Sequence, residues 1–374
     1  MSKLHYNLSF WERETFFKDL DVVVIGSGIV GLSAAVHLKE QHPDRHIIVV
    51  ERGPLPIGAS TRNAGFSCIG SMTELLADMD IRGEDEVLAV VEKRWRGLDA
   101  LRNLLGDKNL HYQNNGGWEM FTEDDDDIFR TCRERIGDFN QKIGAITGHP
   151  SVYNIADDSI KKFGFRGVGH LIHNAVEGQV DTGQMMDTFI RLAQSLGIRI
   201  LNGIDIEKIE DGNNGVRLHT EYGWEIKTQK VLVAVNGFAQ KLLDVPGITP
   251  ARNQVLITKP IPGLRIEGCF HYDRGYFYFR NIHGRILLGG GRNLSPETEL
   301  TDQFGTTDFI KSALVRLLRG VIVPDQMIEV ESWWSGILGI GPEKKPIIEL
   351  VSPNVAVAVR LSGMGVAIGT LVGQ

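Results

Sequence analysis

The stretch that decides the fold is residues 21–51, DVVVIGSGIVGLSAAVHLKEQHPDRHIIVVE. Its first residues, Val22 to Ile25, are apolar and β-branched, which predicts a strand buried on both faces in a parallel sheet. Three glycines follow at the spacing of a tight turn between a strand and a helix: Gly26, Gly28 and Gly31. The stretch closes on a second apolar run, so it predicts a strand, a helix and a second strand.

The same stretch has the parts that bind a dinucleotide. Gly26 allows the sharp turn, Gly28 lets the backbone approach phosphate oxygens, and Gly31 lets the helix pack closely on the strand. The unpaired N–H groups of the helix N-terminus then attract the pyrophosphate. Glu51 can accept the ribose hydroxyls and would repel a 2′-phosphate. We therefore expect NAD or FAD to bind, with a purely structural βαβ unit as the alternative.

Composition excludes several classes of protein. The chain has 374 residues and a formal net charge of -7, and its arginines are scattered, so no nucleic-acid partner is expected. Cys68, Cys132 and Cys269 lie far apart and form no metal-ligand spacing with histidines, which predicts reduced buried thiols and no metal. The acidic run 123–127 is read as the solvated start of a helix, because it lacks the spaced ligands of a calcium loop.

The first twenty residues have charges throughout and no apolar signal segment, and no later run is long enough to span a bilayer. A cytoplasmic protein without a stable membrane span is therefore expected. Phe10, Trp11, Phe16 and Phe17 are expected to pack onto the domain, with peripheral membrane contact as the alternative.

The remaining pattern predicts an α/β protein that is α+β overall: a Rossmann-type nucleotide-binding domain interleaved with an antiparallel-sheet substrate domain. The first domain is expected at residues 1–75, 151–250 and 336–374, and the substrate or cap domain at 76–150 and 251–335. Helices are expected at 72–105 with an interruption near Gly83, at 123–144 and at 183–196, and strands at 118–121, 198–201, 204–209, 216–219, 224–228, 231–235, 254–259, 268–272, 276–280, 285–289 and 354–359. A last glycine-rich turn, RLSGMGVAIG at 360–369, should open another helix.

Six segments in this order resemble a known family: DVVVIGSGIVGLSAA, ERG, GASTRNAG, EGQVDTG, VLVAVNGFA and RLSGMGVAIG. They are similar to the FAD-dependent amine and amino-acid oxidases of the D-amino-acid oxidase superfamily, which includes glycine, sarcosine and γ-glutamylputrescine oxidases. The resemblance favours FAD over NAD. Trp334 to Gly336, followed by Ile340, Gly341 and Pro346, looks most like the γ-glutamylputrescine oxidase branch.

The resemblance implies which residues contact FAD. The pyrophosphate and adenosine half should meet the first turn and its surroundings, and the isoalloxazine should meet the later segments. The implied residues are Gly26, Ser27, Gly28, Ile29, Gly31, Glu51, Arg52, Ala59, Ser60, Thr61, Asn63, Ala64, Gly65, Ile206, Asn236, Gly237, Gly363, Met364, Gly365 and Val366.

The chain departs from the family at the substrate site. Leu338 stands where relatives have a carboxylate-binding arginine, and Ala367 stands where sarcosine oxidase has a lysine. The flavin-linking cysteine expected near Gly336 is missing, which implies non-covalent FAD. Arg280 or Arg360 could replace the missing cations, or either could be a structural ion-pair partner.

Tyr276 and Tyr278 are the polar groups that we expect over the flavin ring, with ordinary sheet packing as the alternative. The implied activity is oxidation of the C–N bond of an amine or amino acid to an imine, by hydride transfer to flavin N5, with O2 or another acceptor. The apolar Leu338, Met364 and Ala367 favour an amine whose carboxylate is remote or absent. Two alternatives stay open: an FAD-dependent dehydrogenase of a hydroxy acid or glycerol phosphate that reduces a quinone, and a flavin-binding or RNA-modification partner without turnover.

Overall fold

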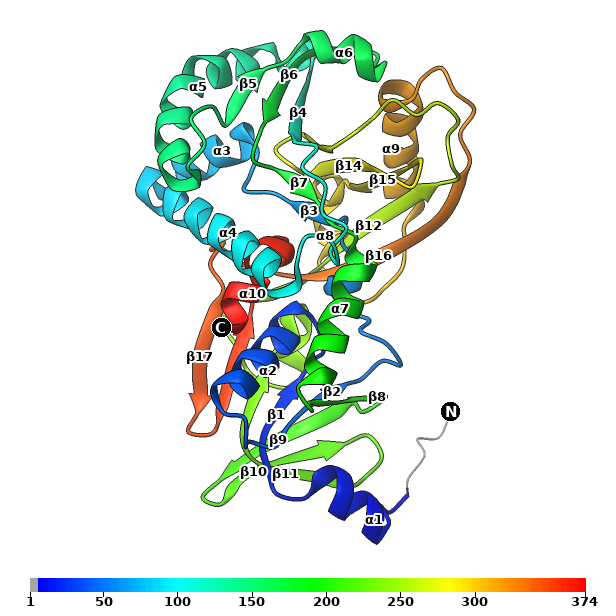
Figure 1. The fold of residues 1–374 in the computed structure, drawn as a ribbon. Helices are drawn as coiled ribbons and strands as arrows, with labels where there is room; N and C mark the ends of the chain where they lie inside the picture. Colours follow the sequence, from blue (N-terminus) through cyan, green and yellow to red (C-terminus); the bar gives the residue numbers. More distant parts are fainter. Residues whose placement is uncertain (1–5) are drawn as a thin grey trace.

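The computed structural model describes residues 6–374, whose strands form two large sheets, one in each half of the molecule (Figure 1). The first sheet has the order β17-β18-β11-β1-β2-β8, and β10 and β9 extend it from β11. Its strands are β1 (Leu20–Ile25), β2 (Ile47–Glu51), β8 (Arg199–Asn202), β9 (Ile206–Gly212), β10 (Gly215–Thr220), β11 (Glu225–Val233), β17 (Ile347–Ser352) and β18 (Val355–Val359). β1 lies parallel to both β2 and β11 at the centre, as the sequence predicts.

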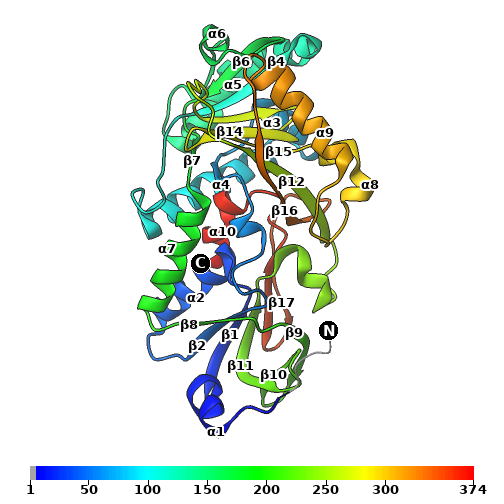
Figure 2. The ribbon, with the colours of Figure 1, turned by 90° about the vertical axis from the view of Figure 1, so that its right-hand side faces the viewer.

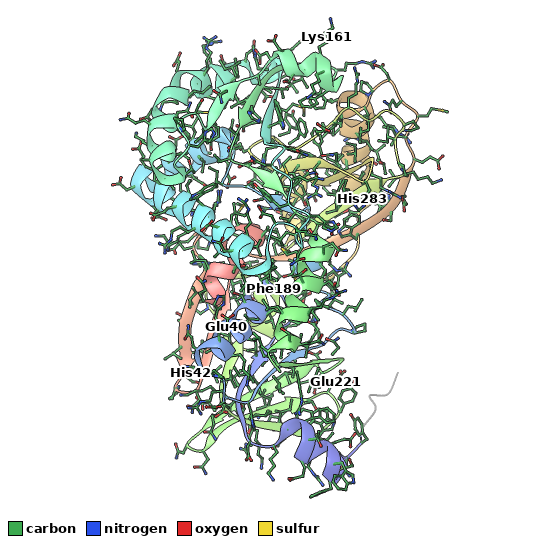
Figure 3. The ribbon with its side chains drawn as sticks, in the orientation of Figure 1. Glu40, His42, Lys161, Phe189, Glu221 and His283 are labelled. Atoms are coloured by element: carbon green, nitrogen blue, oxygen red, sulfur yellow. The ribbon has the colours of Figure 1, made fainter. Side chains whose placement is uncertain are left out.

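Both faces of this sheet are covered. Val24 of β1 packs in a core with the helices α2 (Ile29–Gln41), α7 (Thr182–Ser195) and α10 (Gly365–Gly373). Val23 and Ile25 face the other core, which β9, β10 and β11 complete. Figure 2 shows α2 and α7 beside the sheet, and Figure 3 labels Phe189 of α7, which is fully buried. The apolar β1 run is therefore buried on both sides because two separate cores meet it.

The second sheet has the order β16-β12-β15-β14-β13-β4-β6-β5. Its neighbours are antiparallel except β13 and β4, which run parallel. The strands are β4 (Gly117–Thr122), β5 (Tyr153–Ile155), β6 (Val168–Asn174), β12 (Thr249–Thr258), β13 (Cys269–Tyr272), β14 (Phe277–Ile282), β15 (Arg285–Gly290) and β16 (Val330–Ile340). α9 (Asp308–Leu317) packs against this sheet in a third core, and α3 (Met72–Arg82), α4 (Glu84–Leu105) and α5 (Asp126–Thr147) belong to the core that α2 enters.

Short elements complete the chain. They are α1 (Phe10–Glu12), η1 (Arg13–Phe17), η2 (Ala59–Thr61), β3 (Phe66–Ser67), η3 (Glu123–Asp125), α6 (Asp158–Phe163), β7 (Gly178–Gln179), η4 (Asn236–Lys241), η5 (Arg292–Leu294), α8 (Pro296–Glu299) and η6 (Leu318–Ile322). α3 and α4 separate at Gly83, as predicted, and Asp181 caps α7 by accepting from the Gln184 N–H. The acidic run starts a helix, and there Asp125 closes a capping box with Thr122.

The structure corrects three expectations. Residues 225–233 form one strand, β11, where two strands were expected, because its first half pairs with β10 and its second half continues alongside β1. The strands β16 and β17 were not predicted, since residues 330–340 show no clean alternation, yet β16 pairs with β12 along its length. β5 and β6 belong to the second sheet. The chain therefore leaves the second sheet after Asn174, and not at residue 151, where the nucleotide-binding domain was expected to resume.

The N-terminal segment packs in part. The ring of Phe17 lies 5.1 Å from that of Trp224, and Tyr6 lies against the same indole. Phe10 and Trp11 are exposed, at 60% and 74% of their surface. Residues 1–5 lie outside the described residues. Within residues 6–374, no helix is both long and apolar enough to cross a membrane.

A glycine pair tests the contact between α4 and α10. A Cβ at Gly97 of α4 would lie 2.0 Å from the Ala367 carbonyl oxygen, whereas a Cβ at Gly137 of α5 would meet nothing within 4 Å. Alanine is favoured over glycine in helices by about 1 kcal/mol. We therefore expect Gly137→Ala to raise the free energy of unfolding by up to that amount, and Gly97→Ala to lower it by about 1–3 kcal/mol through overpacking. Thermal unfolding midpoints of both variants measure this, and equal stability would contradict the packing.

Candidate active site

The turn after β1 leaves no room for side chains at two of its glycines. Gly26 has φ +104°, and a Cβ there would lie 2.8 Å from the Ala234 carbonyl oxygen. A Cβ at Gly31 would lie 2.0 Å from the Gly26 carbonyl oxygen. Gly31 therefore serves the close packing of α2 against the turn, as the sequence predicts for a third glycine.

Glu51 is held rigidly at the end of β2. Its Oε2 accepts hydrogen bonds from the Ser27 N–H (3.2 Å) and hydroxyl (2.9 Å), and its Oε1 accepts from the Gly53 N–H (3.0 Å). Ser27 is fully buried and lies outside the cavity, so the structure places it as the support of Glu51 instead of in a phosphate cradle.

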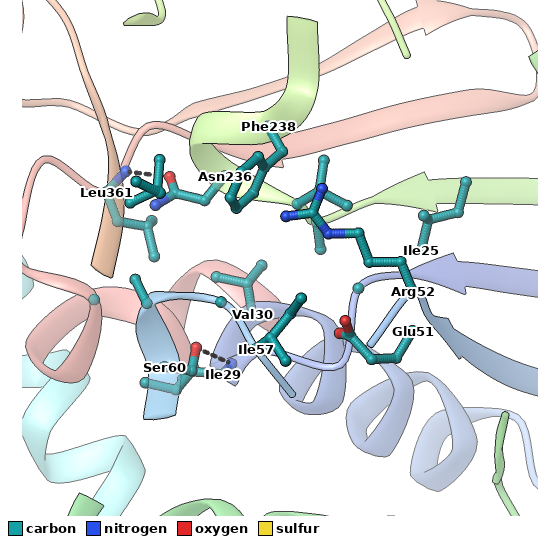
Figure 4. Close-up of a pocket in the computed structure, with 18 of the residues that line it drawn as sticks. Ile25, Ile29, Val30, Glu51, Arg52, Ile57, Ser60, Asn236, Phe238 and Leu361 are labelled. Atoms are coloured by element: carbon teal, nitrogen blue, oxygen red, sulfur yellow. Dashed lines mark hydrogen bonds between the residues drawn. The ribbon is translucent and has the colours of Figure 1, made fainter. Parts of the chain in front are cut away.

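A cavity of about 380 Å³ opens between this turn and the later glycine-rich segments (Figure 4). The predicted residues that line it are Gly26, Gly28, Ile29, Glu51, Arg52, Ala59, Ser60, Asn63, Ile206, Asn236, Gly363, Gly365 and Val366. In both helices that begin at this cavity, α2 and α10, the N-cap residue makes no side-chain capping hydrogen bond. Their N-terminal N–H groups and dipoles favour an anion there.

Hydrogen bonds fix the walls of this cavity. The Ser60 hydroxyl accepts from the Ile29 N–H at 3.0 Å, which ties the loop after β2 to the start of α2. Asn236 Oδ1 accepts from the N–H groups of Arg360 (3.0 Å) and Leu361 (3.3 Å), which ties η4 to the last turn. Figure 4 shows Ser60 beside Ile29, and Asn236 beside Leu361.

A second cavity of about 410 Å³ adjoins the first. The two share wall residues, namely Ala59, Asn63, Leu338, Gly363 and Val366. The predicted residues Ala64, Gly65, Met364, Tyr276 and Tyr278 line the second cavity, together with Ala367. The first cavity can therefore hold a long ligand, and the second cavity forms an adjoining chamber.

The loop at residues 58–65 forms the partition between the cavities. Asn63 Nδ2 donates to the carbonyls of Ala59 and Ser60, and Asn63 Oδ1 accepts from the Gly65 N–H (2.7 Å) and the Thr182 hydroxyl (3.0 Å). Two further predicted residues have structural contacts outside both cavities. The Thr61 hydroxyl donates to the Pro56 carbonyl, and a Cβ at Gly237 would lie 2.4 Å from the Leu338 carbonyl oxygen.

The two arginines considered for substrate binding point elsewhere. Arg280 is buried and its Nη1 donates to the carbonyls of Gly65 (3.0 Å) and Val180 (2.7 Å). Arg360 donates through Nε and Nη1 to the carbonyls of Lys345 and Gly247, both at 2.9 Å. Neither lines the second cavity, so the structure favours the structural alternative for both.

The second cavity has other cations, which the sequence reasoning did not identify. Lys344 is paired with Glu74 (2.9 Å) and Asp78 (2.6 Å). Arg292, by contrast, has no ion pair or side-chain hydrogen bond among residues 6–374, and its guanidinium lies 5.2 Å from the centre of the Tyr276 ring. The signal in the sequence was weak, because Arg292 follows the glycine run at the end of β15 like an ordinary loop residue.

The acid Glu74 at this cavity predicts a pH effect on stability. Burial alone would raise the pKa of Glu74, but the charges of Arg94 and Lys344 lower it to about 2 from 4.5. A lowered pKa in the folded state gives stability that is present above about pH 4.5 and is lost as the pH falls towards 2. Acidification from about pH 6 to pH 3 should therefore lower the unfolding midpoint of the native protein more than that of Glu74→Gln.

Asp127→Asn is the control for that experiment, because the Asp127 side chain is 96% exposed. It should respond to acid as the native protein does. An identical acid response of Glu74→Gln and Asp127→Asn would contradict the ion-pair assignment.

Comparisons with known proteins agree with this geometry. A probable oxidoreductase OrdL of Rhizobium meliloti strain 1021 is 24% identical over 392 residues, covering 99% of this chain and 86% of that protein. The fold is similar to L-proline dehydrogenase from P. horikoshii (TM-score 0.75, 19% identity, 96% of this chain and 92% of that one). It is equally similar to glycine oxidase from Bacillus cereus ATCC 14579 (TM-score 0.75, 17% identity, 95% and 93%).

These likenesses confirm the predicted α/β class, while the γ-glutamylputrescine oxidase branch stays a prediction. The family model described as FAD dependent oxidoreductase matches residues 21–374. Because the match spans nearly the whole chain, this protein belongs to the DAO family of FAD-dependent oxidoreductases.

Proposed function

We propose that this enzyme oxidises the C–N bond of an amine to an imine, and that its substrate has a carboxylate held by Arg292. Bound FAD supplies the acceptor of the hydride that leaves the carbon beside the nitrogen. The protein has to hold the cofactor, orient the amine and exclude water from the chamber. The unpaired guanidinium of Arg292 in the second cavity is the observation that carries the proposal.

The residues of the first cavity fit a non-covalently bound FAD. The N-terminus of α2 suits the pyrophosphate, and Glu51, oriented by Ser27 and Gly53, suits the adenosine ribose. Ile206 lines the same cavity and would border the adenine. Gly363 to Val366 would meet the isoalloxazine, where the α10 dipole favours negative charge on the ring.

An unsatisfied buried atom supports this fit. The Ser362 hydroxyl is buried, has no hydrogen-bond partner and belongs to a residue that lines the second cavity. Buried polar groups without partners are costly, so such a hydroxyl is expected to meet a ligand. It lies beside Gly363, where the two cavities join.

Arg292 suits a carboxylate because Lys344, which lines the same chamber, already has acidic partners. Lys344 is shared by Glu74 and Asp78, and Glu74 also pairs with Arg94 at 3.0 Å. A carboxylate entering this chamber would therefore find its partner at Arg292, over the Tyr276 ring. Arg274 also lines the cavity and is exposed, which adds to the positive charge around the chamber.

The position of Arg292 favours a carboxylate remote from the reacting nitrogen. The family's usual carboxylate position is Leu338, which lines both cavities, and Ala367 and Met364 add apolar surface to the chamber. Burial raises the pKa of Tyr278 to about 12, so its hydroxyl stays protonated near neutral pH and can donate a hydrogen bond to the substrate.

The cofactor prediction is that the purified protein is yellow and that acid precipitation releases FAD and no FMN. Gly28→Leu should abolish FAD retention, since even a Cβ there would lie 2.9 Å from the Ser60 hydroxyl, within the cavity wall. Gly58→Ala is the control, because a Cβ at Gly58 meets nothing within 4 Å although Gly58 lines the same cavity. Flavin that stays attached to the precipitate, or normal flavin content in Gly28→Leu, would contradict this assignment.

The substrate prediction is tested by anaerobic bleaching of the flavin. The panel contains amines with a carboxylate at increasing distance from the nitrogen, α-amino acids and hydroxy acids. We expect bleaching by amines that have a remote carboxylate, and peroxide release in air would identify O2 as the acceptor. Bleaching by hydroxy acids alone would support the dehydrogenase alternative, and no bleaching by any compound would support a flavin-binding protein without turnover.

Arg292→Met tests the anchor itself. We expect KM for the best carboxylate-bearing amine to rise roughly 30-fold, the equivalent of about 2 kcal/mol, with a smaller change in kcat. The same amine without its carboxylate should react equally with both proteins. Arg316→Met, at an exposed arginine of α9, is the control. An unchanged KM in Arg292→Met would show that another group binds the carboxylate.

A further inference from the structure

Three buried side chains from distant parts of the sequence meet beside the second cavity: Cys68, Glu177 and His271. Their ligand atoms all lie within 4.8 Å of one another. The three residues are only 6%, 1% and 7% exposed. Such convergence of a thiol, a carboxylate and an imidazole is what a protein metal site requires.

The backbone fixes this arrangement. β3 and β7 pair antiparallel with Ser67 opposite Gly178, so Cys68, which follows Ser67, lies opposite Glu177, which precedes Gly178. His271 comes from β13, and its Nε2 lies 3.2 Å from Glu177 Oε2. Cys68 and Glu177 thus flank the two paired strands β3 and β7, and His271 lies within β13.

Glu177 is oriented towards the other two groups. Its Oε1 accepts from the N–H groups of Ile69 (2.9 Å) and Gly70 (3.1 Å), which leaves Oε2 facing His271. A Cβ at Gly117 would lie 2.0 Å from this Oε2, so the absence of a side chain at Gly117 makes the space that the carboxylate occupies. Backbone hydrogen bonds of this kind hold a ligand carboxylate in a fixed direction.

The thiol has no competing contact. Cys68 Sγ makes no hydrogen bond among the residues that the structure describes, whereas Cys269 Sγ donates to the Gly178 carbonyl. Cys68 and His271 both line the second cavity, and Glu177 lies behind them. An ion held by the three groups would therefore border the chamber.

Few lysine or arginine side chains balance the buried carboxylates around Cys68, Glu177 and His271. Glu177 and Glu119 are buried, and neither has a lysine or arginine ion pair within residues 6–374. Glu119 accepts hydrogen bonds from the N–H and hydroxyl of Thr73, and the Nε2 of His271 lies 3.2 Å from Oε2 of Glu177. The nearby Arg94 is matched by Glu74. A divalent cation would compensate these buried carboxylates.

We propose that Cys68, Glu177 and His271 bind one divalent ion of the zinc class, with an open coordination position towards the second cavity. A thiolate, an imidazole and a carboxylate form a ligand set that zinc accepts, and three protein ligands with one open position are typical of a catalytic zinc site. The open position could receive a polar group of the substrate, a role that rests on the proposed function. Metal binding itself does not depend on turnover.

The test is titration of the FAD-loaded protein with Zn²⁺ after treatment with a chelator, followed by calorimetry and by metal analysis after dialysis. We expect one equivalent to bind. Cys68→Ala and His271→Gln should each weaken zinc binding at least about 100-fold. Loss of a residue that only hydrogen-bonds a metal ligand already lowers metal affinity about 10- to 100-fold. Cys132→Ala is the matched control, because Cys132 is equally buried but lies in α5, away from the cluster.

Flavin content and unfolding midpoints show whether each variant is folded. Co²⁺ gives a second measurement that needs no variant: a difference spectrum with a thiolate-to-cobalt charge-transfer band shows that a cysteine is a ligand. We expect the band in the native protein and in Cys132→Ala. Native protein that retains no more zinc than Cys68→Ala, or a cobalt spectrum without that band, would overturn the proposal. If zinc binds but no substrate bleaches the flavin, the proposed function fails and the metal site stands.

Discussion

The whole site depends on how the carbonyl of Gly65 is held. This oxygen accepts from the Val180 N–H at 2.8 Å and from Arg280 Nη1 at 3.0 Å, which joins the partition loop to β14 of the second sheet. Gly65 has φ +71°, and a Cβ there would lie 2.3 Å from the Val180 carbonyl oxygen, so only glycine fits. Because the same loop walls both cavities, this contact sets the position of the cofactor wall relative to the substrate chamber.

The fold around the expected cofactor residues could be predicted from the sequence, because its determinants are contiguous. Within residues 21–51 the turn, the helix start and the acid are spaced by the local geometry of one βαβ unit, so spacing alone carries the information. The structure brings Gly28, Glu51 and Asn236 to one cavity, as expected. Ser27 was harder to assign, because its contact with Glu51 is visible only when the side chain's direction is known.

The substrate chamber could not be predicted in the same way, because its residues come together only through strand pairing. Cys68 and Glu177 become neighbours through the two-residue strands β3 and β7, which are too short to give a periodic pattern. Arg280 has the sequence character of a substrate arginine on a strand, but its donors are taken by backbone carbonyls. The separation of residues along the sequence does not show which backbone carbonyls a side chain will meet in the fold.

The cost of leaving buried polar groups unpaired explains why Arg280 and Arg292 have different roles. Recruiting Arg280 to a substrate would leave the Val180 carbonyl without a donor, at about 1–3 kcal/mol for a buried group, and the Gly65 carbonyl with the Val180 N–H as its remaining donor. The link from the partition loop to β14 would then be lost. Arg292 leaves no acceptor of residues 6–374 unpaired when it turns to a ligand, since its guanidinium makes no hydrogen bond to them and lies over the face of Tyr276. A chamber built in this way has its wall fixed by Arg280, while Arg292 is free to contact the carboxylate that we propose for the substrate.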